Sequence, residues 1–352
     1  MAEPIAVVVG GGWWSERAGA GRRIFSTMSR FAKYAWGVLA ANVAVVLWGA
    51  YVRASGSGAG CGSHWPLCQG VVIPADPATA TLIELAHRVT SGTALLLVVG
   101  LFVWSRRVAP RGSAVRRGAA LSLVFMLGEA LLGAGLVLFA LVAHNDSLTR
   151  AFSLGAHLLN TFLLLGSLAL TAWWASGAAP PRLAERRGTA CLLVIGLVGT
   201  MLVGMSGAIT ALGDTLFPAG SLREGLQQDL SPTGHILLRL RVLHPAAAVA
   251  VGLYLIAAAT AIGLRSAAAL PGRFARVLAS LVVLQWLAGM LNIALLAPMW
   301  LQLSHLLLAD AVWLALVLLA AAALADPGRI RVAAPSRPLP AGDTPVVTGA
   351  RG

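Results

Sequence analysis

The sequence predicts an all-α membrane protein in which eight transmembrane helices form two pseudo-symmetric four-helix bundles. Three observations predict this fold: long apolar runs, basic residues placed between the runs, and histidines at matching positions in both halves of the chain. Of the 352 residues, 58% are hydrophobic and only 11% are charged, whereas about a quarter of the residues of a soluble domain are charged. This composition excludes a soluble globular enzyme.

Eight apolar runs are long enough to cross a membrane. A hydrocarbon core of about 30 Å requires about 20 apolar residues in a helix. Runs of this length, bounded by charged residues, Pro or Gly, lie at 34–52, 82–104, 119–141, 153–175, 189–211, 237–263, 277–297 and 302–324. Because their number is even, both chain ends are expected on the same side of the membrane.

The basic residues orient these helices. The chain has 26 basic and 13 acidic residues, and 20 of the basic residues lie near the chain ends or in the loops after the second, fourth and sixth runs. Basic residues concentrate on the cytoplasmic side of a membrane protein. We therefore predict a multi-pass protein of the bacterial inner (cytoplasmic) membrane with both termini in the cytoplasm, and no nucleic-acid partner.

The chain divides into two halves and two terminal segments. We expect a cytoplasmic extension at 1–33, helical halves at 34–175 and 189–324, and a Pro-rich disordered tail at 325–352. The extension shows no apolar segment followed by a cleavage site, so we expect no signal peptide. Met28 could be the true start. The outer loops at 53–81, 142–152 and 212–236 are rich in turn-forming residues.

Four histidines begin the even-numbered helices, near the outer face. They are His87, His157, His244 and His305, at a depth of roughly 5–12 Å given the rise of a helix. Two imidazoles on facing helices of a bundle can hold a haem iron from both sides. We predict two such haem sites, one in each half. The remaining histidines, His64, His144 and His235, are expected to be solvated loop residues.

A charged residue lies three positions before the first histidine of each half, on the same helix face. Glu84 precedes His87, and Arg241 precedes His244. An acid can accept or donate a proton, whereas an arginine can pair with a haem propionate. The alternative for Glu84 and the neighbouring Arg88 is that both face lipid headgroups.

Two cysteines lie in the first outer loop, where oxidising conditions permit a disulfide. Cys61 and Cys68 are either a structural staple or a redox-active or site-covering pair, because the loop leads into the helix of His87. A zinc site that also uses His64 lacks a fourth ligand. Cys191, in the fifth helix, is expected in the core.

Together these residues resemble the haem A synthase family of bacterial and mitochondrial membranes, from about Tyr34 to Leu324. The motifs are Gly49-Ala50-Tyr51-Val52-Arg53, Gly56-Ser57-Gly58, Cys61-Gly62-Ser63-His64-Trp65-Pro66-Leu67-Cys68, Glu84-Leu85-Ala86-His87-Arg88, His157, Leu243-His244-Pro245 and Gln302-Leu303-Ser304-His305. The cysteine pair that encloses Trp-Pro, followed by Glu-x-x-His-Arg, is the most specific part.

The resemblance implies a two-step oxidation of the C8 methyl group of haem O to a formyl group, giving haem A for assembly of cytochrome c oxidase. It also implies roles for the matching residues: His244 and His305 hold a haem b, His87 and His157 flank the iron of the substrate haem, Glu84 is the essential acid, and Cys61 with Cys68 is the outer-loop pair. Many relatives carry a Gln in the third helix near the position of Glu129, whereas the seventh helix of this chain keeps Gln285.

The implied partners are a haem O synthase (a farnesyltransferase) in the same membrane, cytochrome oxidase assembly factors, lipid and an unidentified electron acceptor. The main alternative is a di-haem b-type electron-transfer protein, which would hold two permanent haems. A third interpretation is a transporter built from repeats. That class predicts helices interrupted at mid-membrane, and the sequence shows no such interruption.

Overall fold

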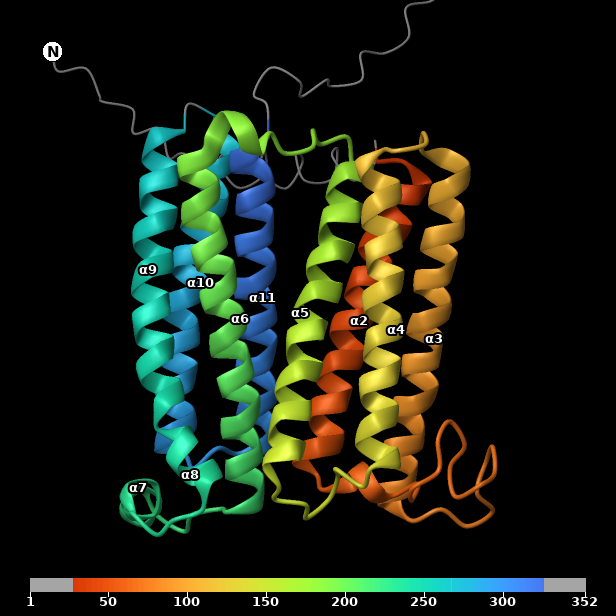
Figure 1. The fold of residues 1–352 in the computed structure, drawn as a ribbon, viewed down its shortest axis with the longest axis vertical. Coiled ribbons are helices and arrows are strands. Elements are labelled where there is room, and N and C mark those ends of the chain that lie inside the picture. Colours follow the sequence, from red (N-terminus) through yellow and green to blue (C-terminus); the bar gives the residue numbers. More distant parts are fainter. Residues whose placement is uncertain (1–27, 267, 326–352) are drawn as a thin grey trace, which may run out of the picture.

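A computed structural model describes residues 28–266 and 268–325 of the chain, which are almost entirely helical. The elements, drawn in Figure 1, are α2 Arg30–Ala54, η1 Ser57–Ala59, α3 Thr79–Val108, α4 Ala114–Leu138, α5 Leu148–Ala175, η2 Leu183–Arg186, α6 Arg187–Leu216, α7 Leu222–Leu230, α8 Ile236–Arg241, α9 Leu243–Arg265, α10 Ala269–Ala294 and α11 Met299–Leu324. Most of the predicted N-terminal extension and of the C-terminal tail lies outside the described residues.

Eight helical segments in the described part are long and apolar enough to cross a membrane, with α8 and α9 forming one of them. The all-α membrane fold is therefore confirmed. Serine side chains fix where several helices begin. Ser29, Ser113 and Ser147 precede α2, α4 and α5, and each hydroxyl accepts a hydrogen bond from a backbone N–H three residues later. Such caps satisfy an N–H group that has no partner inside the helix.

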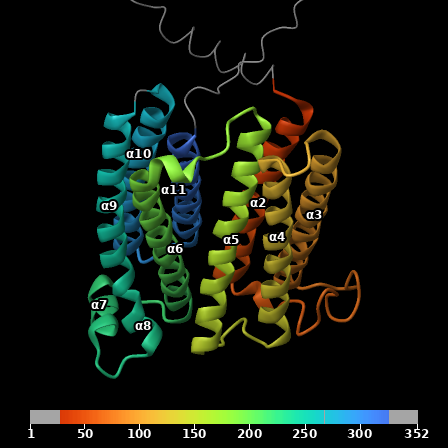
Figure 2. The same ribbon diagram turned by 45° about the horizontal axis from the view of Figure 1, so that its top comes forward.

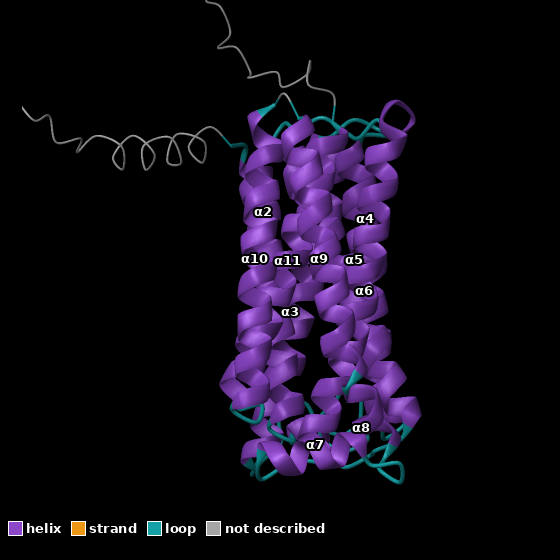
Figure 3. Ribbon diagram, turned by 90° about the vertical axis from the view of Figure 1, so that its left-hand side faces the viewer, coloured by secondary structure: helices purple, strands orange, loops and turns teal. Residues whose placement is uncertain are grey.

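The helices run side by side along the length of the molecule. In Figure 1, α2–α5 lie on the right and α6, α9, α10 and α11 on the left, and Figures 2 and 3 show the same packing from other directions. We call α2–α5 the N-terminal half and α6–α11 the C-terminal half. The pseudo-symmetry of the two halves stays a prediction.

The halves are joined by packing of α11 against α5, α6 and α2. Trp313 of α11 stacks on Phe162 of α5, with ring centroids 5.1 Å apart. Its indole Nε1 also donates a hydrogen bond of 2.6 Å to the carbonyl of Phe162. The stacked ring of this buried indole contributes apolar contact area, and its N–H group makes a hydrogen bond that fixes the orientation of the ring.

The segments that hold residues 55–78, 139–147 and 217–235 lie at one end of the helices, at the bottom of Figure 1. We call this the loop end. The third segment is more helical than the sequence predicted, because α6 continues to Leu216 and α7 follows. The hydroxyl of Ser221 accepts from the N–H of Glu224, and the Glu224 carboxylate accepts from the N–H of Gly220. This pattern is close to a capping box.

The core position predicted for Cys191 is wrong. Its side chain is exposed on α6, on a surface that also exposes Val194, Ile195 and Val198. A helix in a membrane can place apolar side chains on its outer face, because lipid tails are apolar as well. Hydrophobicity therefore does not distinguish the core from the lipid-facing surface here.

Candidate functional site

The four predicted histidines lie nearer the loop end of their helices, and each lies close to a glycine of the preceding membrane-spanning helix. A Cβ atom added to Gly49 of α2 would lie 3.0 Å from Cε1 of His87, and one added to Gly207 of α6 would lie 3.0 Å from Cε1 of His244. A Cβ atom at either glycine would lie closer to the imidazole ring than most Cβ atoms lie to their neighbours. The backbone of the preceding helix therefore forms one wall of each histidine site.

The second histidine of each half has the same kind of neighbour. A Cβ on Gly133 of α4 would lie 4.0 Å from Nε2 of His157, and one on Gly289 of α10 would lie 3.3 Å from Cε1 of His305. These glycines were not predicted from the sequence. The signal that could have found them is their recurrence at equivalent places in the two halves.

Two of the histidines have a polar partner at Nδ1. Nδ1 of His157 is 2.6 Å from Oε2 of Glu129, and Nδ1 of His244 is 3.0 Å from the hydroxyl of Ser206. Such a partner fixes the orientation of the ring and leaves Nε2 for a ligand. The Glu129 carboxylate is itself held, since Oε1 accepts from the amide of Asn160 at 2.7 Å.

The other two histidines each keep a ring nitrogen without a partner. Nδ1 of His87 and Nδ1 of His305 are buried and make no hydrogen bond to the described residues. Nε2 of His305 lies 3.2 Å from the amide nitrogen of Gln285. A buried polar atom without a partner is costly. An iron bound at Nε2 would leave these two Nδ1 atoms in need of a partner other than the iron.

This donor set fits a haem better than a bare metal ion. Residues 28–266 and 268–325 contain no group of three or more His, Cys, Asp or Glu side chains that could hold a metal ion. The histidines instead come in pairs within each half, as axial ligation of a haem iron requires. The two histidines of each half are therefore candidates for the axial ligands of a haem iron.

Glu84 is buried beneath the first loop rather than exposed to lipid. Glu84 is only 4% exposed. Oε2 accepts from the N–H of Cys61 at 2.8 Å, and Oε1 accepts from the guanidinium of Arg88 at 2.5 Å. The alternative that Glu84 and Arg88 face lipid headgroups is wrong.

Arg88 also binds the loop above Glu84. Its Nη1 donates to the carbonyls of His64 at 2.6 Å and Leu67 at 2.5 Å. Cys61 and Cys68 form a disulfide in this loop, and both are buried. The disulfide thus holds together the loop that covers Glu84, which agrees with a site-covering pair and leaves a redox role open.

Arg241, the counterpart of Glu84 in the C-terminal half, is bound by two acids. Its guanidinium donates to Asp229 of α7 at 2.8 Å and to Asp214 of α6 at 2.9 Å. The sequence analysis missed both acids, because they lie in or beside a segment expected to be a loop. The propionate contact predicted for Arg241 stays a prediction.

A further arginine joins the two halves at the loop end. Arg53, at the end of α2, donates to the carbonyl of Ala211 at 2.7 Å and to the hydroxyl of Thr215 at 2.6 Å. It also donates to the amide oxygen of Gln302 at 3.0 Å. Gln302 lies three residues before His305, so Arg53 connects the first half to the helix that bears a histidine of the second.

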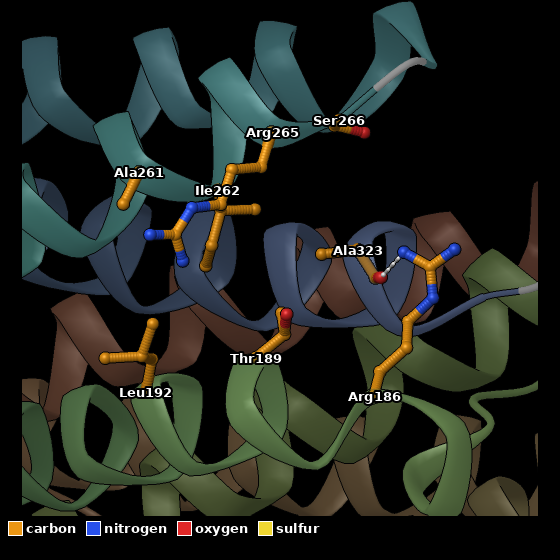
Figure 4. A pocket seen from close by; sticks show the side chains of 8 residues that line it. All are labelled: Arg186, Thr189, Leu192, Ala261, Ile262, Arg265, Ser266 and Ala323. Atoms are coloured by element: carbon orange, nitrogen blue, oxygen red, sulfur yellow. Dashed lines mark hydrogen bonds between the residues drawn. The ribbon is translucent and has the colours of Figure 1, made fainter.

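A small pocket lies at the opposite end of the helices, between α6, α9 and α11. Figure 4 shows its lining residues, which are Arg186, Thr189, Leu192, Ala261, Ile262, Arg265, Ser266 and Ala323. The guanidinium of Arg186 donates to the carbonyl of Ala323 at 3.0 Å. A volume of about 80 Å³ is far below the 300–1,000 Å³ typical of ligand pockets, so this pocket is too small for a porphyrin.

Comparison with known proteins identifies related sequences. The profile of the family described as cytochrome oxidase assembly protein matches residues 32–317. A protein of Thermus thermophilus named protoheme IX farnesyltransferase is 54% identical over 296 residues, which cover 84% of this chain and 49% of the relative. The protein of the same name from a second strain of that species gives the same figures. The chain thus spans about half the length of these Thermus relatives.

A third relative carries a different name. The heme A synthase of Halalkalibacterium halodurans is 39% identical over 127 residues, which cover 36% of this chain and 42% of the relative. Heme A synthases of Bacillus species match a similar share of the chain, at 41% identity over 113 residues for Bacillus mycoides.

Proposed function

Because this chain belongs to the family of cytochrome oxidase assembly proteins, we propose that it is a haem A synthase that oxidises the C8 methyl group of haem O to a formyl group. The observation that carries the proposal is an asymmetry. Both halves hold a histidine pair. Among the residues that the structure describes, an acid contacts one of the two histidines only in the N-terminal half, where a second buried acid lies one turn before the other histidine.

In the N-terminal half, His87 and His157 would hold the iron of the substrate haem. Glu84 lies on the same face of α3 as His87, and Glu129 contacts His157. With water as the oxygen source, each of the two oxidations releases two protons and passes two electrons to the unidentified acceptor, and water leaves when the gem-diol becomes the aldehyde. Glu84 would accept and return protons in these steps, since a buried carboxylate in the site can act as a general base and then as an acid.

In the C-terminal half, His244 and His305 would hold haem b. When bound, this haem would supply the one-electron redox chemistry that amino-acid side chains lack. Ser206 would orient the ring of His244 through its contact with Nδ1. Gln285 would lie beside His305 without offering a proton-transfer group, which suits a site that passes electrons and leaves its own haem unchanged.

The proposed setting is the bacterial inner membrane, with both termini in the cytoplasm and the loop end outside. That orientation places Cys61 and Cys68 on the oxidising side, where disulfides persist. The proposed partners are a haem O synthase, oxidase assembly factors and an unidentified electron acceptor. The Thermus relatives support the first of these, because a segment similar to this chain is part of a longer polypeptide named for farnesyl transfer.

The name of those relatives also makes farnesyl transfer a second candidate activity for this chain. The alignment reaches only 49% of their length, so the rest of the relative can account for the name. The family profile, by contrast, covers the helices that bear all four histidines. These two facts favour oxidation of the haem over its farnesylation.

The test is extraction and chromatography of haem from a host that makes haem O and no haem A, with and without this chain. We expect haem A, or its hydroxylated precursor, only when the chain is present. The control is a host that makes only protohaem: haem O appearing there would identify a farnesyltransferase. Two equivalents of unchanged haem b in the purified protein would identify the electron-transfer alternative and contradict the proposal.

A further inference from the structure

The arginines at the loop end differ in what neutralises them. Six arginines belong to this end. Arg88 and Arg241 are paired with acids, and Arg223 and Arg239 are exposed. Arg53 is half-buried and Arg150 is buried. The last two stand apart, because their charges are removed from water without a carboxylate among their hydrogen-bond acceptors.

Arg150, in the first turn of α5, is only 4% exposed. Its Nη1 donates to the carbonyls of Ala143 at 2.5 Å and Asn145 at 2.7 Å. Its Nε is buried and makes no hydrogen bond to the described residues. The guanidinium thus retains an unused donor in a place that water does not reach.

The acceptors of Arg53 are also neutral: a carbonyl, a hydroxyl and an amide oxygen. The nearby acid Asp214 attracts Arg53, but its carboxylate is hydrogen-bonded to Arg241. Arg53 and Arg150 are close enough for their charges to repel each other. Two cations beside one acid that is shared with a third arginine leave net positive charge in a low-dielectric region, which is costly unless a further anion joins them.

Both arginines lie on the loop-end side of the histidine pair of the N-terminal half, and the guanidinium of Arg53 is hydrogen-bonded to α6 and α11 of the other half. Arg150 and His157 are seven residues apart on α5 and share a helix face, about 10 Å apart along the axis. Arg53 lies one turn beyond Gly49 on α2, the residue that packs against His87. A flat ligand held between the two histidines would therefore have its outer edge directed towards these arginines.

We propose that Arg53 and Arg150 form the binding site for the two propionate carboxylates of the porphyrin held in the N-terminal half. Guanidinium groups bind carboxylates through strong, charge-assisted hydrogen bonds. The inference rests on the proposed function, since it requires a porphyrin at His87 and His157. The inference concerns the porphyrin of the N-terminal half. It does not involve Arg241 of the C-terminal half, whose guanidinium is bound by two acids.

The test uses the full chain in lipid nanodiscs, titrated with ferric protohaem and with its dimethyl ester, in which both carboxylates are blocked. Binding is followed by the Soret band. To isolate one site, both titrations are made with a His244→Ala, His305→Ala variant and with a His87→Ala, His157→Ala variant. The ratio of the two affinities measures recognition of the carboxylates and does not depend on turnover.

We expect the site at His87 and His157 to bind protohaem at least about tenfold more tightly than the ester. Arg53→Gln and Arg150→Gln should each remove most of that preference, and Arg53→Lys should keep part of it. The matched control is Arg186→Gln, which removes a guanidinium at the opposite end of the helices that also donates to a neutral carbonyl. It should leave the ratio unchanged.

An unchanged ratio in Arg53→Gln and Arg150→Gln would overturn the inference. A change seen only in the His87→Ala, His157→Ala background would overturn it as well, because the carboxylates would then belong to the porphyrin of the C-terminal half. If wild-type protein binds neither compound with a bis-histidine spectrum, the proposed function fails first, and the two failures are distinguished by that measurement.

Discussion

The two halves place opposite charges at the same point before their first histidine. Glu84 accepts from the N–H of Cys61 and from Arg88, and so lies under the disulfide loop. Arg241 donates to Asp214 and Asp229, and so fastens α7 to α6. In both halves the charged residue secures its own loop. Only in the N-terminal half is that residue an acid.

The second histidines differ in the same direction. The carboxylate of Glu129 lies 2.6 Å from Nδ1 of His157, whereas the amide nitrogen of Gln285 lies 3.2 Å from Nε2 of His305. The walls that hold the rings are alike, since each histidine packs against a glycine. The two histidine sites therefore have similar glycine contacts but different polar groups. This difference suits an N-terminal site that transforms its porphyrin and a C-terminal site that uses its porphyrin as an electron carrier.

Removing the acid of Glu84 should have the largest effect. Glu84→Gln keeps the shape of the side chain and an oxygen for the N–H of Cys61, but it cannot accept a proton. We expect haem A formation to fall by about a hundredfold or more, while bound haem b stays constant. The measurement is the ratio of haem A to haem O in extracts. Glu185→Gln, an exposed acid, is the control and should retain wild-type yield.

Wild-type yield from Glu84→Gln would remove the functional difference between the halves. A variant that also loses haem b would point to misfolding, and Glu84→Asp then serves as the second test. It retains the acid and should recover part of the activity if proton transfer is the role of Glu84.

Exchanging the partners of the second histidines should have a smaller effect. Glu129→Gln gives the N-terminal half the residue type of the other half, and loss of such a partner typically reduces metal affinity or activity by about 10–100-fold. Gln285→Glu is the reciprocal variant. We expect it to lower the midpoint potential of haem b, because a negative charge beside the haem iron would favour the ferric state. Equal responses in both halves would contradict the assigned roles.

Removing the disulfide tests whether the loop braces Glu84 or takes part in redox chemistry. In the chain-entropy model a bridge that closes so short a loop contributes about 2.5 kcal/mol. Cys61→Ser with Cys68→Ser should therefore lower the melting temperature. It should reduce haem A formation only severalfold, since Arg88 still binds Glu84. Complete loss of activity with unchanged melting would show a redox role.

The smallest effects are expected from the glycines that face the histidines. Gly49→Ala and Gly207→Ala place a methyl group equally close to His87 and His244, 3.0 Å from Cε1 in each case. Each ring must shift by a few tenths of an ångström. Gly49→Ala should weaken binding of the substrate haem, and Gly207→Ala should change the spectrum of haem b. If either variant changes both spectra equally, the sites are not independent.

Features that recur along the chain, such as the apolar runs and the histidines, could be predicted from the sequence. Apolar runs predicted the eight membrane-spanning helices, although the observed helices extend further into polar residues at their ends. The histidines and Glu84 could be selected because ionisable residues are rare in apolar helices. Helix α7 was missed, although Ser221 and Glu224 carry its capping signal.

Other features depend on contacts between distant segments and could not be predicted. The link from Arg53 to α6 and α11 joins residues more than 150 positions apart, and no local pattern indicates it. The pairing of Arg241 with Asp214 and Asp229 likewise depends on how α7 folds back. The exposure of Cys191 was missed because lipid-facing and core residues are equally apolar.

The most direct test of the central claim, that the halves hold haems with different roles, is to identify the haems bound to His157→Ala and His305→Ala. Both variants are purified from a host that makes haem O, and their haems are extracted and separated. The account predicts that His305→Ala loses haem b, whereas His157→Ala keeps haem b and forms no haem A. Loss of the same unmodified haem from both variants would show two equivalent permanent sites and would contradict the account.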